Sequence, residues 1–386
     1  MKKTGKKTEK SEVSKGLENV VVAETKISFI DGEKGRLLYR GYNINDLAKY
    51  SSFEEASYLL LFGKLPTKEE LFTFKKQLAE RREIPKDLQD IMSIFCTSLL
   101  PIDSLRSAVS IMKCFDPAGN DVSREANIKR GIDLIAKLPL IVAYSYRISR
   151  GLKIIRPRKD LDHAENLLYM LQGKESDNLD VKIVDLDMVL HAEHSLNAST
   201  FSARVTISTL SDMYAAITSA IGTLKGPLHG GAVSTVVKML EEIRDEKNVE
   251  NYVKGVLANK KRIMGFGHRV YKIHDPRAII LKETARKVGE RKGNLKFYNM
   301  LVKLEKVMEK QGLYKKGVYP NVDLYTGTTY NNIGIPVELF DTMFALGRIS
   351  GWVAHVLEQL DDNKLIRPLA KYTGPMNLKF VPLEKR

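Results

Sequence analysis

Apolar side chains recur at spacings of three and four residues along most of the chain, a pattern that predicts amphipathic helices. Residues 20–44 instead alternate apolar and polar positions around Asp31-Gly32 and Lys34-Gly35, which predicts one or two short β-hairpins. No βαβ alternation and no repeat of about 20–50 residues is present, which disfavours a Rossmann domain and a helical solenoid. The predicted fold class is therefore mainly α. Helices are predicted at 53–62, 67–81, 86–99, 103–115, 125–149, 160–173, 181–196, 200–223, 232–245, 275–291, 295–311, 323–333, 336–349 and 351–361.

The chain has 386 residues, which suggests two domains or one large one. Its 43% hydrophobic and 28% charged residues are typical of a globular protein. No apolar run of about 18 residues predicts a membrane span, and no apolar stretch after the first lysines indicates a secretion signal. Cys96 and Cys114 lie in apolar helical segments, so both are interpreted as core residues of a protein from a reducing compartment. A cytoplasmic location is expected.

The net charge of +15 makes nucleic-acid binding an alternative to test. Residues 1–15 carry six Lys and two Glu and are expected to form a basic, disordered tail. Elsewhere basic residues are mixed with the 47 acids, and no nucleic-acid-binding module is recognised. We therefore predict a solvated surface suited to a small polyanionic substrate, with no nucleic-acid and no membrane partner. A basic helical binding protein stays open as an alternative.

Four of the seven histidines lie where helical patterns break at glycine or small residues. His191 and His194 belong to HAEHSLNASTFSAR, His229 to GPLHGGA and His268 to GFGHRVYK. Glycine leaves space for a ligand where a larger side chain would block it, so these junctions are candidate binding sites. His191 and His194 are also three residues apart on a predicted helix, which keeps a zinc hydrolase open. HAEH lacks the spacing of a metalloprotease helix and no GxSxG elbow is present, so no metal site and no serine nucleophile are predicted.

Six blocks, in this order and spacing, resemble those of the citrate synthase family. They are HAEHSLNASTFSAR, LKGPLHGGA, MGFGHRVYKIHDPRA, YPNVDLYTG, ALGRISGWVAHVLEQ and LIRPLAKYTGP. They cover the chain from about residue 185 to its C-terminus, and SKGLENV with DGEKGRLLYRGY is similar to the N-terminal hairpin of the family. The compact length resembles the short form found in archaea and many bacteria.

The resemblance implies a two-domain helical fold with a short N-terminal β-hairpin. The expected large domain comprises residues 16–225 and 328–386, and the expected small domain comprises residues 226–327. Closure of the small domain on the large one would assemble the site and exclude water, with rotation hypothesised at Gly226 and Gly327.

The resemblance also implies a Claisen-type condensation of acetyl-coenzyme A with oxaloacetate, followed by hydrolysis of the thioester. Asp323 matches the base that removes a proton from the acetyl methyl group. This proton is very weakly acidic, so a donor must stabilise the developing enolate oxygen, and His229 matches that donor. His268 matches the residue that polarises the oxaloacetate carbonyl and later protonates the alkoxide.

Oxaloacetate carries two carboxylates, which arginines bind through paired, charge-assisted hydrogen bonds. Arg277, Arg348 and Arg367 match the arginines of the family, and His194 matches a substrate-binding histidine. Arg367 is expected to reach the site of the other subunit of a homodimer. The residues that match the coenzyme A site are Ile263, Gly265, Gly267 and Lys272. No metal and no permanently bound cofactor is expected, because acetyl-coenzyme A is substrate and coenzyme A is product.

Other conspicuous residues receive no chemical role. His191 is interpreted as structural, Trp352 and His355 as packing residues on the face of Arg348, and His274 has no matched function. A 2-methylcitrate synthase, which uses propionyl-coenzyme A with the same catalytic residues, remains the nearest alternative. The two acyl groups differ by one methylene, worth only about 1–3 kcal/mol of discrimination, so the blocks leave this choice open.

Overall fold

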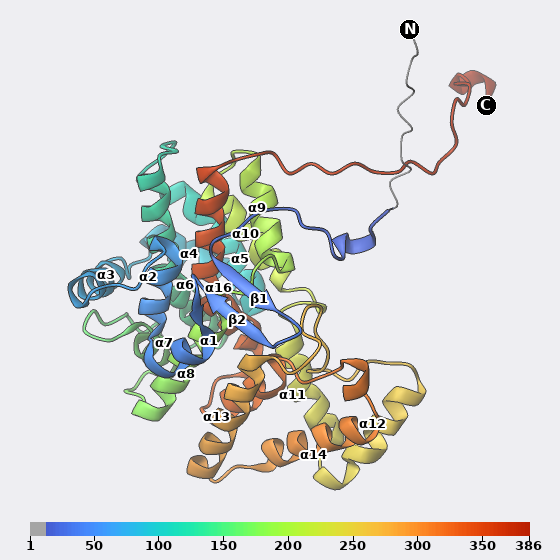
Figure 1. Ribbon diagram of the computed structural model, residues 1–386. Helices are drawn as coiled ribbons and strands as arrows, with labels where there is room; N and C mark the ends of the chain where they lie inside the picture. The colour runs from blue at the N-terminus through green and yellow to red at the C-terminus, as the bar shows by residue number, and fades with distance from the viewer. Residues whose placement is uncertain (1–12) are drawn as a thin grey trace.

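The computed structural model describes residues 13–386, which form sixteen α-helices and one small sheet (Figure 1). The mainly helical class predicted above is therefore confirmed. The predicted basic tail over residues 1–15 lies outside the described residues except for its last three. Among the described helices, none combines the length and the apolar character needed to cross a bilayer.

The predicted hairpin is a three-stranded antiparallel sheet of β1 (Ser28–Asp31), β2 (Arg36–Tyr39) and β3 (Tyr42–Asn43), in that order. Ser28 pairs with Tyr39 and Asp31 with Arg36, so the β1–β2 turn comprises residues 32–35. Asn43 then accepts a hydrogen bond from the N–H of Asn45 and caps the first helix. The alternation in the sequence therefore predicted the sheet correctly.

The helices before Gly226 form the larger part of the molecule, and many begin at a residue whose side chain caps the helix. Thr67 and Glu70, for example, form a reciprocal capping box. These helices are α1 (Ile44–Tyr50), α2 (Phe53–Phe62), α3 (Lys68–Glu80), α4 (Lys86–Phe95), α5 (Pro101–Met112), α6 (Arg124–Ser149), α7 (His163–Gln172), α8 (Asn178–His191), α9 (Ala198–Ser208) and α10 (Met213–Leu224).

The following helices form a second lobe, at the lower right of Figure 1, which we call the α11–α14 lobe. Helix α15 packs against α11, α13 and α14, and its Tyr330 hydroxyl donates to Asp187 of α8, so it connects this lobe to the larger part of the molecule. The bounds are α11 (Ala232–Ile243), α12 (Val249–Ala258), α13 (Pro276–Lys292), α14 (Lys296–Lys310) and α15 (Asp323–Asn332).

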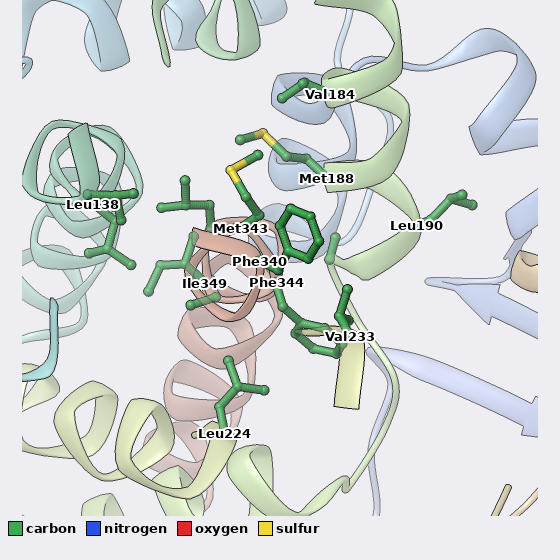
Figure 2. Packing of buried hydrophobic residues seen from close by; sticks show 14 of the residues in the cluster. Leu138, Val184, Met188, Leu190, Leu224, Val233, Phe340, Met343, Phe344 and Ile349 are labelled. Atoms are coloured by element: carbon green, nitrogen blue, oxygen red, sulfur yellow. The ribbon is translucent and has the colours of Figure 1, made fainter. Parts of the chain in front are cut away.

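Helix α16 (Phe340–Asp361) is the central helix of the core and packs against α2, α6, α8, α9 and α10. Figure 2 shows Phe340, Met343, Phe344 and Ile349 of this helix among side chains such as Met188 of α8. Almost every residue of α16 is buried, which is the pattern of a helix surrounded by others.

The two helices predicted over 336–349 and 351–361 are one continuous helix, so this prediction was wrong. Gly347 and Gly351 do not interrupt the helix but let α8 approach it. A Cβ on Gly347 would lie 2.8 Å from the Cβ of His191, and one on Gly351 would lie 2.3 Å from the Ala192 carbonyl oxygen. These glycines therefore reflect close packing, not a helix end.

Three further expectations were wrong or incomplete. The helix predicted over 200–223 is two helices, because Leu210 takes a positive φ of 62° and Asp212 caps α10. Helices α1 and α12 were not predicted. Cys96 is buried as expected, but Cys114 is exposed, because it lies in the 3₁₀ turn that follows α5 and turns outward.

Candidate active site

The segment HAEHSLNASTFSAR leaves the helix after its first histidine but stays largely buried. Helix α8 ends at His191, and Ser195 takes a positive φ of 50°, so the predicted helix over 181–196 is too long. His191 and His194 therefore do not share a helix face, which removes the geometric basis for the zinc pair considered from the sequence. His191 Nδ1 lies 2.9 Å from the Asp187 carbonyl oxygen, and its ring packs edge-on against Phe344 at 4.6 Å.

His194 contacts the segment that carries His268 and Tyr271. Its ring centroid lies 5.0 Å from that of His268, and its Nε2 lies 3.3 Å from the Tyr271 hydroxyl. Burial, with the charge of Arg277 nearby, holds the pKa of His194 well below its usual range. His194 is therefore a neutral imidazole that interacts with the segment carrying His268.

His268 has a defined tautomer. Its Nδ1 accepts hydrogen bonds from the backbone N–H groups of Val270 and Tyr271 at 2.9 and 3.1 Å. Burial lowers its pKa to about 4, so the ring is neutral near pH 7 and its single proton is on Nε2. The Nε2–H group is thus available as a donor to a ligand.

His229 has the opposite tautomer. The backbone N–H of Ser199 donates to its Nε2 at 3.3 Å, and the Ser199 hydroxyl lies 2.8 Å from the same atom. Burial, assisted by the charge of Arg348, lowers its pKa to about 4. Because Nε2 is an acceptor, the ring proton is on Nδ1, and this group is the available donor.

Asp323 is the first residue of α15. Burial raises its pKa to about 6, although the nearby His191 and Arg277 act in the opposite direction. A carboxyl group with this pKa is still mostly ionised at pH 7 and is a stronger base than an exposed aspartate. It is therefore suited to act as a general base.

Backbone pairing connects the loop before His268 to the segment before Asp323. Gly267 N–H donates to the Tyr319 carbonyl at 2.8 Å, and Asn321 N–H donates to the Gly265 carbonyl at 3.0 Å. The Asn321 side chain donates to the Gly267 carbonyl at 3.0 Å. Both catalytic candidates are thus held by one short ladder of hydrogen bonds.

Two of the three candidate arginines are buried beside these groups. Arg277 is 2% exposed and donates through Nε and Nη2 to Asp275, at 3.1 and 2.7 Å. Arg348 is 1% exposed and donates through Nε to the His191 carbonyl at 2.6 Å, while its buried Nη1 has no hydrogen-bond partner among the described residues. A buried guanidinium nitrogen without a partner is costly, so this atom indicates a place for an acceptor from a ligand.

The remaining candidates lie at the surface or in loops. Arg367 and Lys272 are exposed, and Arg367 belongs to the C-terminal segment that extends away from the body in Figure 1. Ile263 is buried, while Gly265 and Gly267 take positive φ values of 79° and 85° in the loop before His268. The site of this chain brings together His194, His229, His268, Asp323, Arg277 and Arg348 but not Arg367.

Two of these histidines lie close enough to Asp275 for the three side chains to be compared with a metal site. Ligand atoms of His194, His268 and Asp275 lie within 4.8 Å of one another. The oxygens of Asp275, however, already accept from the Nε, Nη2 and backbone N–H of Arg277. Asp275 is thus paired with Arg277, whose positive charge disfavours a cation at this position.

Sequence reasoning gave no role to three residues that orient the site. The Tyr271 hydroxyl contacts His194, the Ser199 hydroxyl contacts His229, and Trp352 Nε1 donates to the Ser199 hydroxyl at 3.1 Å. All three lie inside the six sequence blocks, so membership of a block was the only feature of the sequence that indicated a role in the site. Trp352 is buried as expected for a packing residue, as is His355, which contacts Glu193 at 2.9 Å.

The chain is similar to known proteins over nearly its whole length. Residues 16–369 match the family model of the citrate synthase C-terminal domain. The citrate synthase of Haloferax volcanii is 46% identical over 97% of this chain and 99% of its own length, and the 2-methylcitrate synthase 1 of Corynebacterium glutamicum is 41% identical over 97% and 99%. The solved ternary complex of Thermoplasma acidophilum citrate synthase with carboxymethyl coenzyme A and oxaloacetate has a TM-score of 0.92 at 35% identity, covering 97% of this chain and all of that one.

The fold and the site define a large helical enzyme that combines neutral imidazoles, a carboxylate of raised pKa and buried arginines. The chain belongs to the citrate synthase family, whose members are acyltransferases. The resemblance inferred from the six blocks is therefore confirmed over nearly the whole chain.

Proposed function

We propose that this protein condenses acetyl-coenzyme A with oxaloacetate and hydrolyses the product to citrate and coenzyme A. The observation that carries this proposal is the pair of neutral imidazoles, each with one nitrogen occupied by the protein and one N–H available. Two such donors beside a carboxylate of raised pKa suit a reaction in which charge develops on two carbonyl oxygens.

The side chains supply each step of this reaction. Asp323 removes a proton from the acetyl methyl group, and His229 Nδ1–H donates to the thioester oxygen on which charge develops. The new carbon nucleophile attacks the ketone carbon of oxaloacetate, while His268 Nε2–H polarises that carbonyl and protonates the alkoxide. Water then cleaves the thioester and releases the thiol of coenzyme A. No step requires a resident metal or cofactor.

The oxaloacetate carboxylates are assigned to Arg277 and Arg348, with His194 as a further contact. The unpartnered Nη1 of Arg348 supports this assignment, because a carboxylate oxygen would satisfy it. Ile263, Gly265, Gly267 and Lys272 are assigned to coenzyme A. Positive φ at the two glycines supports close approach of a ligand to this backbone.

A homodimer is proposed, in which Arg367 completes the site of the partner subunit. Asn363 and Ile366 still donate to Ser208, and the segment that follows extends away from the body (Figure 1) and exposes large apolar residues. Leu369 is 90% exposed and Phe380 is 82% exposed, which an isolated subunit would not favour. Arg367 lies at the start of this apolar segment, consistent with a role outside its own subunit.

We also propose two moving domains, comprising residues 16–225 with 328–386 and residues 226–327. The α11–α14 lobe supports this division. It would bring His229 and His268 from the smaller unit to His194 and Arg348 of the larger one, with rotation at Gly226 and Gly327.

Release of free thiol from acetyl-coenzyme A in the presence of oxaloacetate tests the proposed reaction. Asp323→Asn is expected to lower kcat by about 10²–10⁴-fold while leaving oxaloacetate binding intact, because only proton abstraction needs the carboxylate. Asp185→Asn is a matched control: burial raises the pKa of Asp185 to about 7, and its Oδ1 accepts from Phe53 N–H, a bond that asparagine retains. Turnover by Asp323→Asn equal to that of this control would remove Asp323 from the role.

A second acyl group remains a candidate because of the Corynebacterium glutamicum relative. Propionyl-coenzyme A in the same thiol assay distinguishes the two reactions. We expect a higher kcat/KM with acetyl-coenzyme A, since the citrate synthase of Haloferax volcanii is the more similar relative. A higher value with propionyl-coenzyme A would assign the protein to methylcitrate synthesis.

A further inference from the structure

The turn between β1 and β2 lies against the segment that carries His268 and Arg277. Lys272 N–H donates to the Gly32 carbonyl at 3.0 Å, a backbone bond between residues 240 positions apart in the numbering. Figure 1 shows the β1–β2 hairpin pointing from the helical body toward the α11–α14 lobe. This contact therefore joins the two parts of the molecule that contribute to the site.

The contact is too close for any residue but glycine. A Cβ on Gly32 would lie 2.2 Å from the Val270 carbonyl oxygen and 2.9 Å from the Val270 carbonyl carbon. A Cβ on Gly35, which has a φ of 58°, would lie 2.9 Å from the His274 carbonyl oxygen. Two glycines of one turn thus touch both ends of the segment 270–274.

The peptide touched by Gly32 is also the peptide that orients His268. The Val270 carbonyl and the Tyr271 N–H belong to one planar unit, so they move together. This Tyr271 N–H donates to His268 Nδ1 at 3.1 Å, and the Tyr271 hydroxyl lies 3.3 Å from His194 Nε2. Displacement of the Val270 carbonyl would therefore turn the group that sets the His268 tautomer.

The other end of the hairpin is fixed beside His194. Ser28 Oγ donates to Glu193 Oε1 at 2.9 Å and accepts from Ser195 N–H at 3.1 Å. Glu193 N–H donates to the Tyr39 hydroxyl at 3.2 Å. Glu193 and Ser195 are the two neighbours of His194 in the chain, so the hairpin holds both sides of this residue.

We infer that the β1–β2 hairpin is a strut that sets the position of His268 relative to His194 when the two proposed domains are together, with Gly32 and Gly35 as positioning residues. It fixes the loop after α8 at its base and the Val270–Tyr271 peptide at its turn. This inference rests on the proposed function only for its kinetic readout, since the geometry of the His268 ring is observable by itself.

Gly32→Ala tests the strut, with Gly255→Ala as its control. Neither glycine has a positive φ, and a Cβ at Gly255 would meet nothing within 4 Å. Gly32→Ala is expected to lower kcat/KM for oxaloacetate at least tenfold, with a smaller change in KM for acetyl-coenzyme A. Gly255→Ala is expected to stay within twofold of the parent protein. Equal kinetics for the two variants would overturn the inference.

Ring ¹⁵N spectra of the histidines give a readout that a merely structural role would not change. The parent protein is expected to show His268 with an unprotonated Nδ1, assigned by loss of the signal in His268→Gln. In Gly32→Ala this signature is expected to shift toward a mixture of tautomers, and an unchanged His268 spectrum would overturn the inference. Absence of thioester turnover in the parent would refute the proposed reaction and leave this spectroscopic test valid.

Circular dichroism and thermal melting show whether Gly32→Ala folds. If it does not fold, Gly35→Ala tests the strut, with Gly41→Ala as its control. Both glycines have positive φ and lie in turns of the same sheet, but a Cβ at Gly41 would meet nothing within 4 Å. Alanine is more strained at the φ of 92° of Gly41 than at the φ of 58° of Gly35, so a greater loss in Gly35→Ala comes from the contact with the segment 270–274 and not from backbone strain. Loss of kcat/KM at least fivefold greater in Gly35→Ala supports the strut, and equal loss overturns it.

Discussion

His229 follows helix α10 in a glycine-rich turn, whereas His268 lies in the loop before α13. Burial lowers the pKa of each imidazole to about 4, so the two rings have the same charge. They differ in which nitrogen is occupied: Ser199 N–H donates to Nε2 of His229, and two backbone N–H groups donate to Nδ1 of His268. Backbone N–H groups that face each ring, not the imidazole itself, therefore select the nitrogen that stays free to donate.

Removing either donor is the strongest test of the comparison. His229→Ala and His268→Ala are each expected to lower kcat/KM about 10²–10³-fold, the usual effect of losing one donor to a developing oxyanion. The thiol-release assay measures both. A loss of kcat/KM below tenfold at either position would show that this imidazole does not stabilise a developing charge.

Lowering the pH separates the two imidazoles from the carboxylate. The pKa of Asp323 is about 6, so its basic form is lost as the pH falls through 6, and kcat/KM should fall about tenfold per unit below that value. The imidazoles, with pKa values of about 4, stay neutral over the same range. His268→Gln should keep the limb near pH 6 at a lower rate, whereas an acid limb centred near pH 4 would contradict the assignment.

Amide substitutions test the tautomers directly. Asparagine places its N–H₂ group near the position of Nδ1, and glutamine places it near that of Nε2. His229→Asn should therefore retain about tenfold more activity than His229→Gln, while His268→Gln should exceed His268→Asn by a similar factor, the value of roughly one hydrogen bond. The same preference at both positions would refute the opposite tautomers.

The smallest expected effect concerns the groups behind His229. Ser199→Ala removes the hydroxyl but keeps the backbone N–H that donates to Nε2, so kcat should fall only about 2–10-fold. Trp352→Phe removes the donor to that hydroxyl and should have a similar or smaller effect. Ser202→Ala, on the same helix, is the control, because Ser202 pairs with Ser219 instead. A loss above 10²-fold in Ser199→Ala would mean that the hydroxyl itself sets the tautomer.

The sequence predicted much of the fold because helical periodicity is a local property. The spacing of apolar residues located most helices and the alternation over 20–44 located the sheet. The predicted helix bounds were wrong where the conformation or packing of a single residue determined whether a helix ended. Leu210 broke one predicted helix through a positive φ, and Gly351 did not break another, because it packs against Ala192.

The candidate site was predicted through its blocks. The six ordered blocks identified the family and named His194, His229, His268, Asp323, Arg277 and Arg348, which the structure brings together. Tyr271 and Ser199 lay in the same blocks, but their roles depend on partners 77 and 30 residues away. No local pattern contains that information.

The sequence by itself determined which residue types are present, which segments are helical and to which family the chain belongs. The tertiary structure alone decided that α8 ends at His191, that Cys114 is exposed, which ring nitrogens of His229 and His268 are free, and that Gly32 touches the Val270 peptide. The physical reason is that periodicity and caps act over a few residues. The His229 tautomer and the Gly32 contact arise instead from hydrogen bonds and packing between segments far apart in the chain, and the His268 tautomer arises from an irregular turn that periodicity does not specify.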